Sequence, residues 1–499
     1  MAGGALALLC LAGVALLLWR SSAGAASGCD RTATPATFTA EVSRAAPGQT
    51  ICLASGDYGL WHGVHKAITL TPRIGASPRM GFQFGAHAAG FTINGGMSSF
   101  SQGWGLRITD EAEPDIAAGA HDIRIDNTAF SVGLEIDGPT DANIVFNHDL
   151  FEGLDGFDYA AALHLAYRNR RPSGITVENS MFRDMSADAI QTGIAMSILG
   201  NEFVNVQPDA AGGNESLHTD AVQLYGATDD LIAGNYVHGG CEQGIGAFDG
   251  TAANTVVDNV IVGCTAHSLV MGGDKDPGSL VDHNTVIGDR TATIDCSSKP
   301  GEGPSTTAVL DNIARGGLER GNGADECRPS ENTHNLFGAG GRPPNRHGHP
   351  RFVAGATPAG YFGFQLAPGS RGRDAATDGF DVGARIASVP GTRGDRGLTL
   401  PSRPKLRETR ISSRRRSGGF TFLATGAVRY QCALVGPAPT AADARRRTKR
   451  RLRFHACESP QRYAGLTPGH YVFEVRSQNN AGIDRDARTR PFRISTGRR

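Results

Sequence analysis

Short runs of alternating apolar and polar residues fill residues 29 to 388, and an asparagine recurs among them in a constant context. The recurring unit is an apolar residue, two spacers, Asn, one spacer and a second apolar residue. It appears around Asn94, Asn127, Asn179, Asn201, Asn235, Asn259, Asn284, Asn312 and Asn335. Most intervals are about 20 to 35 residues, which is too long for β-hairpins and too short for βαβ units. They fit coils of a parallel β-solenoid, in which each coil covers the apolar face of the previous one.

The repeated asparagine predicts a ladder of side-chain amides, because equivalent turns of successive coils stack along the axis. This pattern resembles right-handed parallel β-helix proteins such as pectate lyases, polygalacturonases and chondroitinase B-like lyases. Residues 46 to 58 resemble their opening coil, and residues 350 to 384 resemble their closing segment. We therefore expect an all-β chain with a right-handed parallel β-helix of about ten coils over residues 29 to 388. The fold alone does not specify the chemistry.

The C-terminal part has a different pattern. Residues 389 to 417 contain Pro390, Pro401 and Pro404 among nine basic residues and show no apolar period, which predicts an exposed linker. Residues 418 to 496 alternate like β-strands, and the segment from Leu466 to Gly482 resembles the late strands of fibronectin type III or immunoglobulin-like domains. We expect a small β-sandwich there.

The pattern of the N-terminal residues predicts an export signal. The apolar run Ala5 to Trp19 has 15 residues, short of the roughly 20 that span a bilayer, and Ala23 to Ala25 offers a cleavage site. We predict a signal peptide over residues 1 to 25, with an uncleaved anchor as the alternative. No transmembrane segment is expected after cleavage.

Without Cys10, which lies in the signal, eight cysteines remain in a chain that enters an oxidising compartment. Their proximity in sequence predicts four disulfides: Cys29 with Cys52, Cys241 with Cys264, Cys296 with Cys327, and Cys432 with Cys457. No C-x-x-C motif occurs, which argues against a thiolate zinc site.

Composition and charge refine this picture. Hydrophobic residues make up 39% of the chain and charged residues 20%, which excludes general disorder. The net charge of zero hides an asymmetry, because residues 389 to 499 carry 25 Lys and Arg against 7 Asp and Glu, and residues 1 to 388 carry 24 against 42. A basic tail attracts anionic polymers, or else the two parts attract each other. The stretch Arg445 to Arg453, which we expect to be a loop, either grips such a polymer or is merely solvated.

Candidate site residues follow from aligning the strand after each Asn turn. Six segments share a small, an apolar and a variable residue in succession, and strand alternation puts the variable residue outward. This outward column is Glu135, His164, Gln191, Gln223, Gly246 and Val270. The column just before the strand is Val132, Ala161, Asp188, Asp220, Gln243 and His267.

The strongest signal is a doubled Asp-Ala-(Ile or Val)-Gln, which begins at Asp188 and again at Asp220. The two carboxyl groups are predicted to stack about 5 Å apart in one outward-facing trough. Such a pair shares a proton, binds a cation such as calcium, receives a basic substrate group, or serves a retaining glycosidase as acid and nucleophile. The structural alternative is that both aspartates accept turn N–H groups.

The segment around His218 and Asp220 is also similar to the N-T-D-G-x-D motif of polygalacturonases. Glu242-Gln243 and Ala266-His267-Ser268 occupy the places of their next two motifs. One acidic residue of the family's pair is missing and no R-I-K follows, so this resemblance does not support polygalacturonase hydrolysis.

A polysaccharide lyase needs a base beside a uronate carboxyl group and a cation or Arg to neutralise that group. Candidate bases are His164, His218 and His267. Candidate neutralisers are Arg168, Arg170 and Arg171, or calcium held by Asp188 and Asp220. Further candidate substrate contacts are Glu135, Gln191, Gln223, Tyr167, Tyr225 and Glu242.

We therefore hypothesise a secreted, monomeric polysaccharide-active protein, with β-elimination favoured over glycoside hydrolysis and calcium as the candidate cofactor. The competing hypothesis is a non-catalytic surface protein that binds wall glycan and is anchored by its basic sandwich. No nucleic acid partner is expected.

Overall fold

The computed structural model describes residues 28–109, 114–137, 142–155, 161–169, 173–212, 218–248, 250–271, 278–289, 291–296, 305–321, 326–386, 400–424, 426–448, 452–484 and 486–496. The signal peptide expected over residues 1 to 25 lies outside these residues, as does the linker segment from 389 to 399. No helix within the described ranges has both the length and the apolar character needed to cross a membrane.

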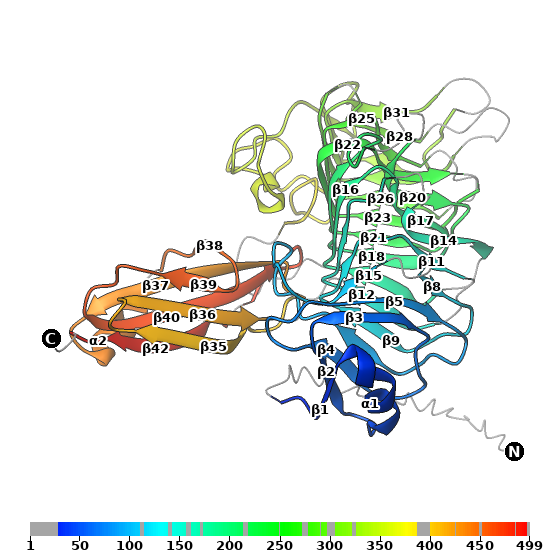
Figure 1. Ribbon diagram of the computed structural model, residues 1–499. Coiled ribbons are helices and arrows are strands. Elements are labelled where there is room, and N and C mark those ends of the chain that lie inside the picture. Colours follow the sequence, from blue (N-terminus) through cyan, green and yellow to red (C-terminus); the bar gives the residue numbers. More distant parts are fainter. Residues whose placement is uncertain are drawn as a thin grey trace, which may run out of the picture.

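The body of the molecule is a right-handed parallel β-helix, as the repeat predicted (Figure 1). One face is a parallel sheet of 13 strands. In order, they are β1 (Arg31–Ala33), β2 (Thr50–Leu53), β4 (Thr69–Pro72), β6 (Thr92–Asn94), β9 (Ile123–Asp126), β12 (Ile144–Asn147), β15 (Ile175–Glu178), β18 (Met196–Leu199), β21 (Leu231–Ala233), β23 (Thr255–Val257), β26 (Leu280–Asp282), β29 (Ala308–Leu310) and β32 (Asn332–Thr333). The sheet has more strands than the expected ten coils because the first coils precede the Asn repeat.

The rest of each coil belongs to a second sheet, which bends so that most coils contribute two stacked strands. The stack that follows the Asn turn contains β7 (Arg107–Ile108), β10 (Ala129–Phe130), β13 (Leu150–Glu152), β16 (Met181–Met185), β19 (Glu202–Val206), β24 (Val260–Val262), β27 (Thr285–Ile287), β30 (Ile313–Ala314), β33 (Leu336–Phe337) and β34 (Arg346–His347). The stack beyond the bend contains β8 (Asp115–Ile116), β11 (Leu134–Ile136), β14 (Ala161–Asn169), β17 (Asp188–Ile194), β20 (Asp220–Tyr225), β25 (Cys264–Val270), β28 (Thr293–Asp295) and β31 (Gly317–Glu319). The long β22 (Tyr236–Phe248) and β5 (Pro78–Phe84) pair with both stacks, and β3 (Gly56–Trp61) pairs with β5.

Inward-facing side chains stack along the axis of the solenoid. Phe130, Phe151, Phe182 and Phe203 occupy paired positions on successive coils, and their ring centroids are 4.4, 4.6 and 5.0 Å apart. Parallel, in-register strands impose this spacing, because equivalent residues repeat at the interstrand distance of about 4.8 Å. The core is therefore built from the columns that the repeat predicted.

The predicted amide ladder exists over six consecutive coils. Asn201, Asn235, Asn259, Asn284, Asn312 and Asn335 are buried, and each Nδ2 donates to the Oδ1 of the next residue in this series at 2.9 to 3.1 Å. Asn335 continues the row by donating to Asn345 at 2.9 Å. Each turn thus satisfies its polar groups with those of the neighbouring coil.

The earlier asparagines of the repeat do not belong to this ladder, which corrects the expectation of one common turn position. Asn127 and Asn179 lie one residue before the ladder position and have positive φ angles of 56° and 53°. Asn94 lies two residues before it, as the last residue of β6. Asparagine tolerates the left-handed conformation. It is therefore favoured both at this left-handed position and at the ladder position, and the sequence pattern does not distinguish the two.

Further segments cover the N-terminal end of the solenoid and one flank of its later coils. At the N-terminal end, a 3-10 helix (Pro35–Thr37) leads into α1 (Phe38–Arg44), whose buried Phe38 contacts Tyr58 and Trp61 edge to face. The segment from residue 350 to 386 includes the 3-10 helix Tyr361–Phe364 and packs on the side of the later coils. Tyr361 Oη donates to the Asp258 carbonyl oxygen at 3.0 Å.

All four predicted disulfides are present: Cys29–Cys52, Cys241–Cys264, Cys296–Cys327 and Cys432–Cys457. Cys241 and Cys264 occupy directly paired positions of β22 and β25 and therefore join two successive coils. This cysteine pattern fits a protein that folds in an oxidising compartment.

The C-terminal part is a small antiparallel β-sandwich. Its three-stranded sheet contains β35 (Lys405–Ser412), β36 (Ser417–Leu423) and β39 (Gln461–Tyr463). Its five-stranded sheet contains β37 (Arg429–Ala438), β38 (His455–Cys457), β40 (Gly469–Asn479), β41 (Gly482–Ile483) and β42 (Arg488–Ile494), with α2 (Ala441–Thr448) packed on it. The core between the sheets includes stacked Phe420 and Phe473.

Two expectations about this part are wrong. The linker predicted over 389–417 ends earlier, because β35 pairs with β36 and belongs to the sandwich. Its side chains are mostly half-buried and charged, so it lacks the alternating apolar pattern of a central strand. The basic stretch from Arg445 is also not simply a loop, because its first four residues form the last turn of α2.

The sandwich rests on the side of the solenoid at the Asn turns (Figure 1). Asn480 Nδ2 donates to the Gly234 carbonyl oxygen at 2.9 Å, and Asn479 Nδ2 donates to Asn179 Oδ1 at 3.2 Å. Arg429 forms an ion pair with Glu202. Ala481 packs into a small apolar cluster with Leu199, Ala233 and Val257.

Candidate functional site

The predicted outward column is a continuous row in the structure. Backbone pairing aligns Glu135 with His164, then Gln191, Gln223, Gly246 and Val270. The row extends beyond the prediction, to Asp115 and Gln83 on one side and to Asp295 and Glu319 on the other. Ten positions at the interstrand spacing give a row about 43 Å long.

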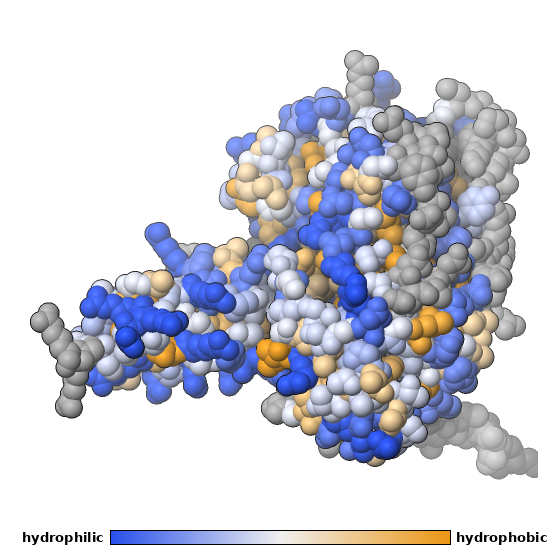
Figure 2. All heavy atoms as spheres, in the orientation of Figure 1, coloured by the Kyte–Doolittle hydropathy of each residue, from blue (hydrophilic) through white to orange (hydrophobic). Residues whose placement is uncertain are grey.

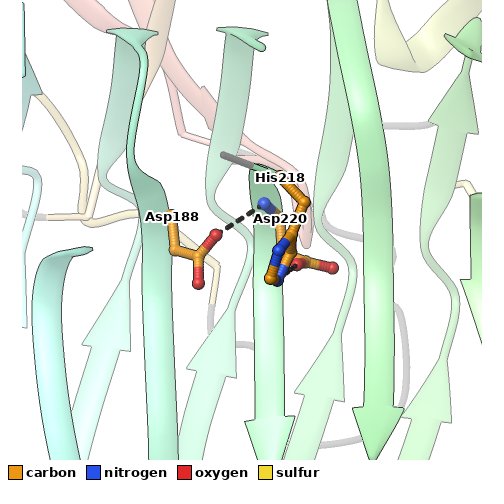
Figure 3. Close-up of side chains that lie close together, drawn as sticks. All are labelled: Asp188, His218 and Asp220. Carbon is orange, nitrogen blue, oxygen red and sulfur yellow. Dashed lines mark hydrogen bonds and ion pairs between the residues drawn. The ribbon is translucent and has the colours of Figure 1, made fainter. Parts of the chain in front are cut away.

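Asp188 and Asp220, the predicted pair, begin the neighbouring strands β17 and β20 (Figure 3). Asp188 Oδ1 accepts the backbone N–H of Asp220 at 2.8 Å. His218 lies on the segment just before β20, and its Nε2 is 3.5 Å from Asp220 Oδ2. One ligand atom from each of the three residues lies within 4.8 Å of the other two. The doubled motif therefore brings two carboxyl groups and an imidazole together.

The pair is not exposed in an open trough, which corrects the sequence-based expectation. Asp188 is 4% exposed and Asp220 is 0% exposed. The side chain of His218, by contrast, is 58% exposed. The alternative in which both aspartates accept turn N–H groups fits Asp188, whereas Asp220 Oδ1 is buried and has no hydrogen-bond partner among the described residues.

Burial dominates the electrostatics of the pair. It raises the pKa of Asp188 to about 7, although the Asp220 N–H bond and the nearby charge of His164 act in the opposite direction. Burial also raises the pKa of Asp220 well above its ordinary value, and the negative charges of Asp188 and Glu242 add to this effect. A proton shared by the pair or a bound cation would relieve the repulsion.

The space beside Asp220 depends on a glycine. A Cβ atom at position 246 would lie 3.1 Å from Asp220 Oδ1 and 2.3 Å from Cε2 of Phe248. Any other residue at 246 would therefore displace the Phe248 ring or press on the carboxyl group. Gly246 was expected only as a member of the outward column, because nothing in the sequence indicates that this ring covers the aspartate.

The amides of the column support the exposed histidine. Gln191 Nε2 donates to Gln223 Oε1, and Gln223 Nε2 lies 2.9 Å from His218 Nε2. Gln223 is buried and Gln191 is half-buried. They act as positioning groups for His218 more directly than as open substrate contacts.

A second acid–base pair lies on the adjacent coils. His164 Nδ1 is 2.6 Å from Glu135 Oε2, and both side chains are partly exposed. The sequence placed the two residues in one column, but it did not indicate that Glu135 would orient the imidazole. A carboxylate bound to Nδ1 fixes the ring and leaves Nε2 to exchange a proton.

The remaining candidates are more dispersed. Glu242 accepts the Thr219 backbone N–H at 2.8 Å and so holds the segment before Asp220. His267 is exposed but lies two strands beyond Asp220, which is about 10 Å away. Tyr225 is 42% exposed at the end of β20 and pairs with Phe248.

Four candidates cannot be placed. Tyr167 and Arg168 belong to β14, but their side chains lie outside the described residues. Arg170 and Arg171 lie outside them altogether.

Acidic groups surround the candidate site. Burial raises the pKa of Asp115, and the charges of Asp137 and Glu135 raise it further. Among the described residues of the ten-position row, four are carboxylic acids and none is Lys or Arg. A polyanion would therefore be repelled unless a cation bridges the contact.

Two solved structures are distantly similar to this chain. One is an alginate lyase of family PL6, AlyGC, with 12% identity and a TM-score of 0.33 over 72% of this chain and 59% of that chain. The other is the pectate lyase Pel9A, with 12% identity and a TM-score of 0.24 over 72% of this chain and 96% of that chain. The match thus spans less than two thirds of the alginate lyase chain. No protein-family model and no curated protein matches this sequence. Likeness at this level does not specify an activity.

A second histidine cluster lies outside this row and serves the fold. His283 Nδ1 is 2.6 Å from Asp282 Oδ1, and neighbouring Asp311 accepts the Thr377 backbone N–H at 2.8 Å. Asp258 on the same turn column pairs with Arg385 at 3.2 Å. These contacts hold the segment from 350 to 386 against the solenoid. The sequence signal was present, since Asp258, His283 and Asp311 each occupy the left-handed turn position directly before a ladder Asn.

Proposed function

We propose that this chain is a polysaccharide lyase-like enzyme that cleaves an acidic polysaccharide by cation-assisted β-elimination at the Asp188–Asp220 pair. The observation that supports it most is the pair itself. Two buried carboxyl groups meet beside a partly exposed histidine, and Asp220 Oδ1 has no hydrogen-bond partner within the described part of the chain. A buried carboxylate oxygen without a partner costs free energy, and a ligand bound at this oxygen would recover that cost.

The residues present fit a hard divalent cation such as calcium. Carboxylate oxygens are its preferred ligands, and the unpartnered Oδ1 of Asp220 lies beside Gly246, which has no side chain to press on it. Asp188 and Asp220 would hold the ion. When bound, it would supply the positive charge that neutralises a uronate carboxylate and lets a polyanion approach an acidic groove.

The protein's own residues would then supply the proton transfer. His164, oriented by Glu135 through Nδ1, is the proposed base, because this contact fixes the ring and leaves Nε2 to take the proton. His218, positioned by Gln223, is the proposed donor to the leaving oxygen, because its side chain is exposed beside the pair. The base removes the proton next to the uronate carboxyl group, the double bond forms, and the glycosidic oxygen leaves with a proton.

Hydrolysis remains the second candidate because burial raises the pKa of Asp188 to about 7, as a general acid requires. The zero exposure of Asp220 disfavours it as the nucleophile of a retaining mechanism. The non-catalytic alternative predicts glycan binding without turnover.

The test is incubation of the full chain with polygalacturonate, alginate and hyaluronan, with calcium or with a chelator. Unsaturated products are followed by ultraviolet absorbance, and new reducing ends are measured in parallel. We expect unsaturated products that require the cation, and a loss of at least about 100-fold for Asp220→Asn and for His164→Ala.

Asp229→Asn is the matched control, because Asp229 is an exposed carboxylate on the turn after β20 and lies outside the site. It should retain full activity. Reducing ends without unsaturation would replace elimination by hydrolysis. Binding without either product, unchanged in Asp220→Asn, would replace the enzyme by a binding protein.

A further inference from the structure

A second ligand site is indicated at the end of the sandwich that points away from the solenoid. A hollow of about 440 Å³ lies between the end of β37, the beginning of β40 and the end of β42. The contacts to the solenoid are made at the opposite end of β40, ten residues away, which is about 33 Å along a strand. Figure 1 shows α2 at this distant end.

The walls of the hollow combine flat apolar surfaces with cations. Pro437, Pro439 and Pro468 line it together with His470 and Arg493. His470 and Arg493 are directly paired across β40 and β42, so their side chains leave the same face of the sheet. No carboxylate lines the hollow among the described residues. A site of this kind fits a ring with an attached anionic group.

Helix α2 adds positive charge to the rim. Arg447 Nη1 donates to the Pro437 carbonyl oxygen at 3.0 Å, which fixes the helix beside the hollow, and Ala444 packs against Val472 and Ala438 of the sheet. Arg446 is paired with Asp443 on the helix. Arg445 is exposed on the same last turn. Figure 2 shows that hydrophilic residues dominate the visible face of the sandwich.

We infer that this hollow binds the carboxylate-bearing sugar residues of an acidic polysaccharide, with Arg493 as the main anion contact. A planar guanidinium matches a carboxylate with two parallel hydrogen bonds, and proline rings offer apolar surface to the C–H face of a sugar. Nucleic acid is the less suitable polyanion, because no Phe, Tyr or Trp side chain lines the hollow within the described residues to stack on a base. The site is separate from the Asp188–Asp220 pair and does not depend on its chemistry.

The experiment measures binding and not turnover, so it is independent of the proposed reaction. The full chain carrying Asp220→Asn, in the presence of a chelator, is titrated with fluorescently labelled oligogalacturonate at low salt. Arg493→Gln in the same background should weaken binding about tenfold. Arg462→Gln is the matched control, because Arg462 is an exposed arginine on β39 of the other sheet, and it should change affinity less than twofold.

Three results would overturn the inference. The first is an absence of oligogalacturonate binding. The second is an equal loss in Arg493→Gln and Arg462→Gln, which would indicate diffuse charge without a site. The third is tighter binding of a single-stranded oligonucleotide of equal charge. Weakening by added salt in the parent chain and not in Arg493→Gln would support the inference, because exposed charge contacts are screened.

Discussion

Asp220 occupies a place from which water is almost excluded, yet its Oδ1 has no hydrogen-bond partner among the described residues. The Asp188 side chain is better satisfied, because its Oδ1 accepts a backbone N–H. Burying a second carboxylate beside the first costs free energy through desolvation and repulsion. The fold tolerates this cost where β17 and β20 begin, and on the next coil Gly246 has no Cβ atom to press on Asp220 Oδ1.

The raised pKa of Asp188 predicts how stability changes with pH. The unfolded chain releases this proton near pH 4, whereas the folded chain holds it until about pH 7. The folded state therefore binds more protons in this window, and stability falls as the pH rises through it. In chelator, we expect the melting temperature to fall between pH 4.5 and 8 and Asp188→Asn to fall less.

Added calcium provides the control for this prediction. At pH 7.5, calcium should raise the melting temperature of the parent chain and leave that of Asp220→Asn unchanged. Other buried acids, such as Asp149 and Asp230, also have raised pKa values and contribute the same sign, so the difference between the variants is the relevant quantity. Equal slopes for Asp188→Asn and the parent would contradict the assignment.

For single residues, the sequence predicted which side chains are adjacent better than it predicted how deeply they are buried. The doubled Asp-Ala-x-Gln predicted that Asp188 and Asp220 would be adjacent, because in-register coils place equal positions together. It did not predict their burial, because the covering ring of Phe248 and the space at Gly246 come from a different coil. The Glu135–His164 contact was missed for a related reason, since alignment gives columns but not side-chain conformations.

The turns of the solenoid are held by their amides. Asn259 donates to Asn284 Oδ1 and to the Ile232 carbonyl oxygen, and it accepts from both the side chain and the backbone of Asn235. Every one of these groups is buried. The ladder therefore joins coils that are far apart in sequence and gives each turn a fixed place on the axis.

Replacing Asn259 with Ala would leave several buried polar groups without partners. Each unsatisfied group costs about 1 to 3 kcal/mol, so we expect a loss of several kcal/mol in the free energy of unfolding. Urea unfolding followed by circular dichroism measures it. Asn143→Gly is the control, because Asn143 is exposed and has a positive φ that glycine accepts, and it should change stability little. Similar losses in both variants would show that the ladder has no special role.

The elements themselves were predictable to different degrees. The repeat of apolar positions predicted the solenoid, because its interval fits one coil and the same residue, Asn, recurs at the turn. Strand β35 was missed because an edge strand with charged side chains has no alternating apolar pattern. The helix in the basic stretch was missed because seven Arg and Lys among the nine residues 445 to 453 suggest solvent exposure, which does not distinguish a helix from a loop.

In the whole molecule, the charge asymmetry does not explain how the two parts meet. The contact includes the amides of Asn479 and Asn480, a small apolar cluster around Ala481, and the ion pair of Arg429 with Glu202. Hydrogen bonds from Ser98 to Ser459 and from Ser101 to Glu458 add to it. Glu202 also accepts from His238 at 2.9 Å. Burial raises the pKa of Glu202, but the His238 hydrogen bond and the charge of Arg429 outweigh it and lower the pKa below its ordinary value.

Arg429→Ala should loosen the sandwich, because it removes the guanidinium partner of the buried Glu202 carboxylate and leaves it with the His238 contact. We expect faster hydrogen exchange in residues 198–203 and 477–483 and a lower melting temperature. Arg410→Ala is the control, because Arg410 is an exposed arginine of the sandwich that pairs only locally with Glu408. Unchanged exchange in Arg429→Ala would show that the other contacts hold the sandwich without this ion pair.

The contact between the sandwich and the solenoid also determines how a truncated chain would behave. Leu199, Ala233 and Val257 form an apolar strip on the flank of the solenoid, and Ala481 with its neighbours shields it from water. A chain that stopped before residue 400 would present this strip, together with the uncapped carbonyl oxygens of Gly200 and Gly234, to solvent and to other molecules. We therefore expect the isolated solenoid to self-associate through this strip, which the sandwich covers in the full chain.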